Sequence, residues 1–152
     1  MTLDNLAKIG RLKAHVASVD EVADLLNAAL RNLDDAHADN ISPENRFDAA
    51  YKCIQQSGLV GLLAHGFRPD TKAAGHHQTV IQSLPKTIGL DVGRIAVLDA
   101  LRNKRNLSDY TGRPIDLASL DACIDEARRL LMDVIAWLIA NRRDLLPRPP
   151  QS

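Results

Sequence analysis

The chain has 152 residues, the size of one ordinary domain. Its 19 Lys and Arg residues balance its 19 Asp and Glu residues, so the formal net charge is zero. This balance argues against a basic nucleic-acid coat protein but leaves room for one local basic site. Aromatic residues make up 3% of the chain, fewer than a platform that stacks single-stranded bases usually needs.

The sequence carries no sign of export or of membrane insertion. Cys53 and Cys123 form no disulfide pattern, and the opening MTLDNLAKIG does not have the pattern of a signal peptide. No apolar run approaches the ~20 residues of a membrane span. We therefore expect a cytoplasmic protein with no membrane partner.

Two amphipathic helices are predicted in the first half of the chain. In residues 18–36, Ser18 and Glu21 form a capping box, and apolar residues then recur at steps of three and four. In residues 42–66, Ser42 is a good N-cap, Pro43 fits the first helical position and Gly66 is the expected C-cap. Gly58 and Gly61 inside this second helix mark a close approach of another helix.

The second half of the chain is also predicted to be helical. Residues 66–75 are interpreted as a loop, and residues 76–84 as a short helix stopped by Pro85. A longer helix follows over 91–106, and the last covers 116–143 with apolar spacing close to a heptad.

No segment alternates with a period of two over a useful length. The expected fold is therefore all-α, an up-and-down bundle of four main helices plus short ones. It forms a single domain over residues 1–146, followed by a Pro-rich disordered tail over 147–152.

The segment LRNKRNLSDYTGRP, residues 101–114, concentrates basic side chains near the predicted end of a helix. With Ile95 set at 0° and 100° per residue, the neighbouring apolar side chains centre near ~280°. Arg105 falls at about 280° and Arg102 at about 340°, so both face the apolar side. Either the two arginines and Lys104 complement the dipole and last carbonyls of the helix, or the arginines line an interface or a cleft.

The charge count around this segment favours a phosphate-bearing ligand. Residues 94–113 hold five basic residues and two acidic ones, a local surplus of three positive charges in a chain that is neutral overall.

The spacing Arg105-Asn106-x-x-x-Tyr110 resembles the Arg-x4–6-His signature of the HEPN superfamily of small α-helical bundles. The resemblance extends to most of the chain, because the two early helices, the Arg-Asn helix and the long closing helix come in the family's order. The chain looks most like the short bacterial stand-alone HEPN proteins. Many HEPN proteins are metal-independent endoribonucleases, often toxins or defence effectors, and they typically dimerise with their two motifs side by side.

This resemblance implies roles for three residues. Arg105 would bind the scissile phosphate, which suits a side chain that is always charged and binds phosphate in bidentate fashion, and Asn106 would shape the cleft. Tyr110 stands where the family has His. A Tyr with a pKa near ~10 is a poor base at pH 7 but can donate a hydrogen bond or a proton.

Other side chains are candidates for the same site. Arg102, Lys104 and Arg113 could contact phosphate, and either Arg102 or Arg105 could be its main ligand. His76 and His77 either cap a helix and lie exposed, the interpretation we favour, or one of them reaches the cleft in place of the missing His. No metal or cofactor is expected, because the His pair has no ligand at a suitable spacing.

The resemblance also implies a partner. Some HEPN toxins are encoded beside a small nucleotidyltransferase antitoxin, which can silence them by adenylylating a Tyr near the motif. Tyr110, at an expected turn, is the candidate for this modification.

Three hypotheses follow. The chain is a HEPN-type RNA-processing protein, or a catalytically degenerate HEPN bundle that binds nucleic acid or protein as a dimerisation module, or a bundle whose arginines are purely structural. The first two predict an RNA contact, and the resemblance implies a homodimer.

Overall fold

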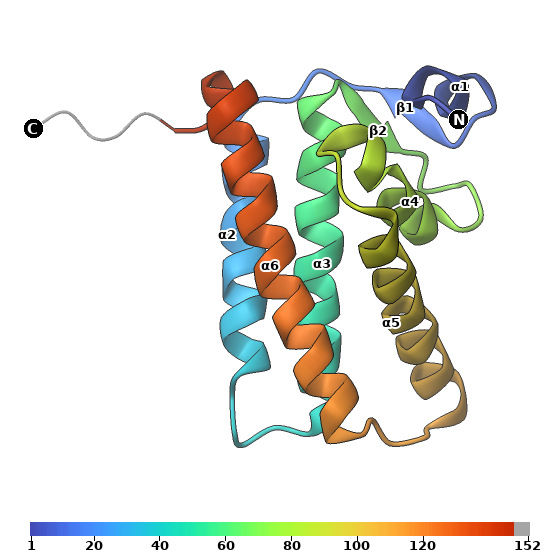
Figure 1. Ribbon diagram of the computed structural model, residues 1–152, viewed down its shortest axis with the longest axis vertical. Helices are drawn as coiled ribbons and strands as arrows, with labels where there is room; N and C mark the ends of the chain where they lie inside the picture. Colours follow the sequence, from blue (N-terminus) through green and yellow to red (C-terminus); the bar gives the residue numbers. More distant parts are fainter. Residues whose placement is uncertain (148–152) are drawn as a thin grey trace, which may run out of the picture.

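The computed structural model describes residues 1–147. Within them, four long helices form the body of the protein: α2 (Val19–Ala36), α3 (Pro43–Ala64), α5 (Val92–Thr111) and α6 (Leu117–Asn141). In Figure 1, α2 and α5 run down the page while α3 and α6 run up it. This arrangement confirms the predicted all-α, up-and-down bundle.

Short elements gather at one end of the bundle. They are α1 (Leu3–Lys8), β1 (Leu12–Ala14), β2 (Phe67–Pro69), α4 (His76–Thr87) and the 3-10 turn Arg143–Leu145. The strands β1 and β2 pair antiparallel, with Leu12 opposite Pro69 and Ala14 opposite Phe67. The prediction that residues 66–75 are only a loop is therefore wrong at its start, because a three-residue strand is too short to show an alternating pattern.

The predicted helix starts are confirmed. The Ser18 side chain accepts a hydrogen bond from the Glu21 amide, and the Glu21 side chain accepts one from the Ser18 amide, which completes the capping box. Ser42 caps α3, with Pro43 at the first helical position. At the other end of α3, His65 is the C-cap and Gly66 follows with φ of 83°, a left-handed conformation that glycine adopts without strain.

Two predicted helix ends are wrong. Helix α4 does not stop at Pro85 but includes it and continues to Thr87, because the proline removes only one amide and the Ile88 amide still bonds to the Leu84 carbonyl. Helix α5 continues past Asn106 to Thr111 and ends at Gly112, whose φ is 70°. The exposed polar residues between these points carry no apolar period, so the sequence pattern could not follow the helix there.

Helix α3 is the centre of the bundle. It packs against α2, α4, α5 and α6, and the long side chains of Phe47, Tyr51, Ile54 and Leu62 are almost completely buried. The main core continues from α3 into α6 through Leu120, Leu130 and other buried side chains. A second, smaller apolar cluster joins Leu12, Leu62 and Val80 under α1.

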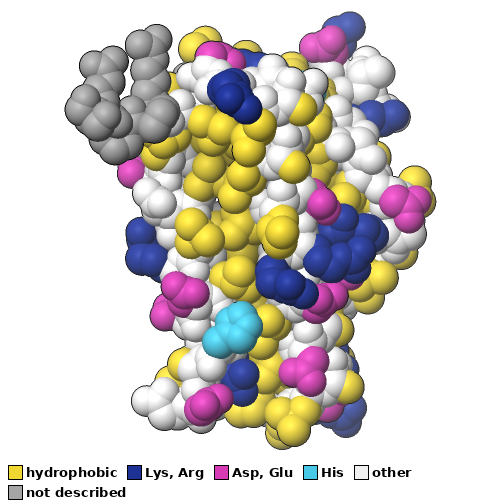
Figure 2. All heavy atoms as spheres, turned by 60° about the vertical axis from the view of Figure 1, so that its left-hand side comes forward, with side chains coloured by type: hydrophobic (Ala, Val, Ile, Leu, Met, Phe, Trp, Pro, Cys, Tyr) yellow, Lys and Arg dark blue, Asp and Glu magenta, His cyan; other side chains and the backbone are white. Residues whose placement is uncertain are grey.

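The outer surface of the bundle is not uniformly polar. Hydrophobic side chains form a vertical band on the side of α2 and α6, as Figure 2 shows. Exposed apolar residues on these two helices include Leu30, Leu117, Met132 and Ile139. Among residues 1–147, no helix has both the length and the apolar character that crossing a membrane requires. Most of the predicted tail, residues 148–152, lies outside the described residues.

Gly58 and Gly61 allow α4 to lie directly on α3, as the sequence predicts. A Cβ at Gly58 would lie 2.6 Å from Val80 Cγ1, and a Cβ at Gly61 would lie 3.1 Å from Thr87 Oγ1. The first distance is too short for two carbon atoms, so a side chain at position 58 would push α4 away.

Gly58→Ala should therefore destabilise the protein, although Gly to Ala inside a helix is normally favourable by about 1 kcal/mol. We expect the free energy of unfolding to fall by about 1–3 kcal/mol because of overpacking against Val80. Urea denaturation measures this change.

The same substitution in a Val80→Ala background should be neutral or stabilising, because the conflicting methyl group is then absent. An equal loss of stability in both backgrounds would show that contact with Val80 is not the reason for the glycine.

Candidate functional site

Helix α5 places the basic cluster in its interior rather than at its end. Because α5 continues to Thr111, its last turn contains no basic residue. Arg102, Lys104 and Arg105 therefore do not cap the helix, and this alternative is wrong. Both arginine side chains are largely buried, with 15% and 22% exposed, which confirms that Arg102 and Arg105 face the packed side of α5.

Arg105 is fixed against α3 by two residues that the sequence analysis did not select. Its Nε donates a hydrogen bond of 2.7 Å to Asp48 Oδ1, and its guanidinium carbon lies 4.9 Å from the centre of the Tyr51 ring. Burial alone would lower the pKa of Arg105, but the hydrogen bond and charge of Asp48 raise it above its usual value. Asp109, 3.8 Å from Nη2, adds a weaker ion pair. The guanidinium is thus always charged, and its Nη donors are not all used.

The other basic candidates are separated in space. Arg102 donates to Asp99 on its own helix at 2.9 Å. Lys104 faces the start of α6, where its Nζ contacts Asp116 Oδ1 at 2.7 Å and Ser119 Oγ at 2.6 Å. This contact lowers the pKa of Asp116 well below its usual range, so Lys104 joins α5 to α6. Arg113 is exposed beyond the end of α5.

The histidine pair, His76 and His77, lies at the N-terminal end of α4, near the Tyr51 ring that Arg105 contacts. The rings of His76 and His77 are 4.5 Å apart, and the His77 ring lies 6.2 Å from that of Tyr51. Gln55 holds the junction together, because its Nε2 donates to Tyr51 Oη at 2.9 Å and to the His77 carbonyl at 3.2 Å. The structure therefore brings α3, α4 and α5 together around one buried tyrosine.

The pKa shifts at this junction have a common origin. Burial lowers the pKa of His77 below its usual value, and the charges of His76, Arg105 and Arg102 lower it further. His77 is thus mainly neutral at pH 7 and able to accept a proton. Burial also raises the pKa of Tyr51 to about 12, against the opposing charge of Arg105, so Tyr51 stays protonated.

Asn106 and Tyr110 do not face this junction. Both are exposed, and Tyr110 exposes 92% of its surface. Tyr110 lies in the last turn of α5 rather than in a turn after the helix, so it is about 140° around the axis from Arg105. Within one chain, Arg105 and Tyr110 therefore point in different directions.

Acidic side chains from other helices offset the local positive charge that the sequence shows. Arg94 forms ion pairs with Glu126 and Asp133 of α6, Lys104 with Asp116, and Arg105 with Asp48. The surplus of three charges along residues 94–113 is therefore not an unpaired basic surface.

Asp48, Tyr51 and Gln55 are the site residues that sequence reasoning missed. The Asp48 side chain is 32% exposed and pairs with Arg105. Their spacing could have grouped these three residues, since positions 48, 51 and 55 share one face of a helix. Nothing in the sequence alone shows that this face packs on α5, because Arg105 comes 57 positions after Asp48 in the chain.

Comparison with known proteins does not assign the chain to a family. No protein-family model matches the chain, and a search of curated proteins finds no match. Within residues 1–147, no group of three or more His, Cys, Asp or Glu side chains is placed to hold a metal ion. The site must therefore be interpreted from its own geometry.

Replacing Arg105 by Gln should raise the pKa of His77, because a nearby positive charge that disfavours the imidazolium is removed. The pKa can be measured by following the His77 ring signals by NMR between pH 4 and pH 8. Since the pKa of His77 is lowered on folding, protonation of His77 favours unfolding. Stability should therefore decrease as the pH falls below about 6.5, and less steeply in the variant.

Arg113→Gln is the matched control, because it removes an exposed basic charge outside the junction. Equal shifts of the His77 pKa in both variants, or no shift in either, would contradict the placement of His77 beside Arg105.

Proposed function

We propose that the chain is an RNA-directed helical bundle of the HEPN type, that it acts in a toxin–antitoxin or defence system, and that it cleaves RNA without a metal ion. The observation that carries the proposal is the meeting of Arg105 and His77 around Tyr51. A fixed cation and a neutral imidazole at one junction supply two of the groups that metal-free RNA cleavage uses, a stabiliser of phosphate charge and a general base.

The chemistry divides between α4 and α5. Arg105 binds a non-bridging phosphate oxygen through its Nη donors and stabilises the charge that develops there. His77 accepts the proton of the ribose 2′-hydroxyl, whose oxygen attacks the adjacent phosphorus. This assignment gives His77 the role that the HEPN signature gives to the residue at position 110, and Asn106 stays a candidate for shaping the cleft.

A homodimer would complete the site. The leaving 5′-oxygen needs a proton, and Tyr110 can supply it only where a second copy of the chain brings it to the junction, because it points away from Arg105 in its own chain. Leu107 exposes 54% of its surface and Tyr110 92%, both on the last turns of α5. These apolar side chains offer a contact for such a dimer.

The alternative proposal is a catalytically degenerate module that binds RNA or protein and cuts nothing. Two observations favour it. Asp99 and Asp48 already occupy Nε of Arg102 and Arg105, and Tyr110 does not face the arginines.

An RNA cleavage assay on the purified protein, in the presence of a metal chelator, separates the two proposals. We expect Arg105→Ala to reduce cleavage by about 10²- to 10³-fold and His77→Gln by about 10²- to 10⁴-fold. Tyr110→Phe should also slow cleavage if the hydroxyl donates a proton. Arg128→Ala is the matched control, because Arg128 is an exposed arginine that also pairs with a carboxylate, Asp125, but lies on α6.

If no cleavage is seen, a measurement of RNA binding at low salt separates the remaining explanations. Binding without cleavage, lost in Arg105→Ala and kept in Arg128→Ala, would support the degenerate module. If the wild-type protein neither cuts nor binds RNA, both proposals are wrong and the arginines serve only the packing of α5 on α3.

We also propose Tyr110 as the acceptor of a regulatory adenylyl group. Its exposed phenol oxygen can attack the α-phosphorus of ATP bound to a nucleotidyltransferase antitoxin, with pyrophosphate as the leaving group. Mass spectrometry of protein co-expressed with a neighbouring nucleotidyltransferase gene should show one added AMP on Tyr110 and none in Tyr110→Phe. An unmodified Tyr110 would refute this assignment, and an AMP group on buried Tyr51 would also contradict it.

A further inference from the structure

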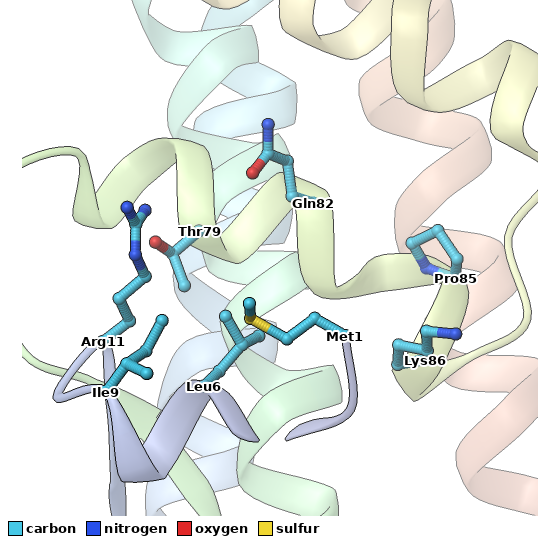
Figure 3. A pocket seen from close by; sticks show the side chains of 8 residues that line it. All are labelled: Met1, Leu6, Ile9, Arg11, Thr79, Gln82, Pro85 and Lys86. Atoms are coloured by element: carbon cyan, nitrogen blue, oxygen red, sulfur yellow. The ribbon is translucent and has the colours of Figure 1, made fainter. Parts of the chain in front are cut away.

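A cavity lies between α1 and α4, outside the arginine junction. Its volume is about 370 Å³, within the range of small-molecule sites. Figure 3 shows Leu6, Ile9 and Arg11 rising from α1 and the segment after it, while Thr79, Gln82, Pro85 and Lys86 come from α4. Met1 completes the lining.

One part of the lining is apolar. Met1, Leu6, Ile9 and Pro85 present hydrophobic side chains, and Met1 and Ile9 expose 70% and 55% of their surface. Leu6 also packs on the small apolar cluster of Leu12, Leu62 and Val80. The cavity therefore offers exposed hydrophobic surface beside this small buried apolar cluster.

Two basic residues also line the cavity, and Figure 3 shows them at its opposite ends, Arg11 after α1 and Lys86 on α4. No acidic residue belongs to the lining. Among the described residues, neither side chain takes part in a hydrogen bond or an ion pair, in contrast to Arg105 and Lys104, which are paired. Thr79 and Gln82 add a hydroxyl and an amide to the lining.

We propose that this cavity binds a small amphipathic carboxylate, an unbranched alkyl chain that ends in a carboxyl group. The carboxylate pairs with Arg11, whose planar guanidinium matches it with two parallel hydrogen bonds. Lys86 lies at the opposite end of the lining and adds to the positive charge of the cavity as a whole. The alkyl chain covers Leu6, Ile9 and Met1. An unpaired guanidinium in a lining that has no acidic residue selects a negatively charged ligand, and the apolar wall selects one with a hydrocarbon body.

Isothermal titration calorimetry with sodium decanoate tests the proposal. Decanoate should bind with one-to-one stoichiometry, whereas acetate lacks the chain and 1-decanol lacks the charge, so each should bind at least tenfold more weakly. Arg11→Gln should weaken decanoate binding about tenfold, because a charge-assisted hydrogen bond is lost. Arg68→Gln is the matched control, since Arg68 is an exposed arginine on β2 that does not line the cavity.

A second variant separates loss of binding from loss of folding. Gln82 is exposed on α4 and lines the cavity, so Gln82→Trp should fill the cavity without disturbing the core, and should abolish binding while thermal stability stays within a few degrees of wild type. The proposal is overturned if decanoate does not bind, if 1-decanol binds equally well, or if binding is the same in Arg11→Gln, Gln82→Trp and Arg68→Gln. None of these outcomes depends on the RNA assay, because the variants leave α5 and the His pair unchanged.

Discussion

The contact between α4 and α3 at Gly58 is the constraint on which the site depends. Without a side chain at position 58, the Val80 methyl groups approach the α3 backbone, and α4 can lie flat on the central helix. At its N-terminal end, His77 then lies with its ring 6.2 Å from that of Tyr51 on α3. Arg105 from α5 contacts the same ring. One close helix contact therefore brings the His77 imidazole to the same tyrosine that the Arg105 guanidinium contacts.

Apolar packing and ion pairs join different pairs of helices. The buried apolar residues of α3 and α6 hold the bundle together, whereas Arg94 and Lys104 join α5 to α6 through carboxylates. Arg105 is different, because it joins α5 to α3 and yet keeps donors unused. A group held in place by one partner, with capacity for another, suits recognition better than simple structural pairing.

The sequence predicted the features that local rules govern and missed those that distant residues decide. Ser18, Glu21, Ser42 and Pro43 define helix starts through nearest neighbours, and the apolar period placed Arg105 on the packed side of α5. The strands β1 and β2 were missed because a three-residue strand stabilised by its partner carries no pattern of its own. The partners of Arg105 were missed for the same reason, since Asp48 acts through a contact between separate helices.

The pairing of both arginines with aspartates has a consequence for any polyanion that binds there. A phosphate that takes a guanidinium from Asp48 or Asp99 leaves a bare carboxylate in its place, and that carboxylate attracts a cation from solution. Binding then exchanges one anion for another at each arginine, with cations released from the nucleic acid and partly recaptured by the protein. The affinity would depend less on salt concentration than the number of arginine contacts suggests. If these arginines bind a polyanion, the aspartates would favour a ligand whose shape places a phosphate on each guanidinium over one that offers negative charge alone.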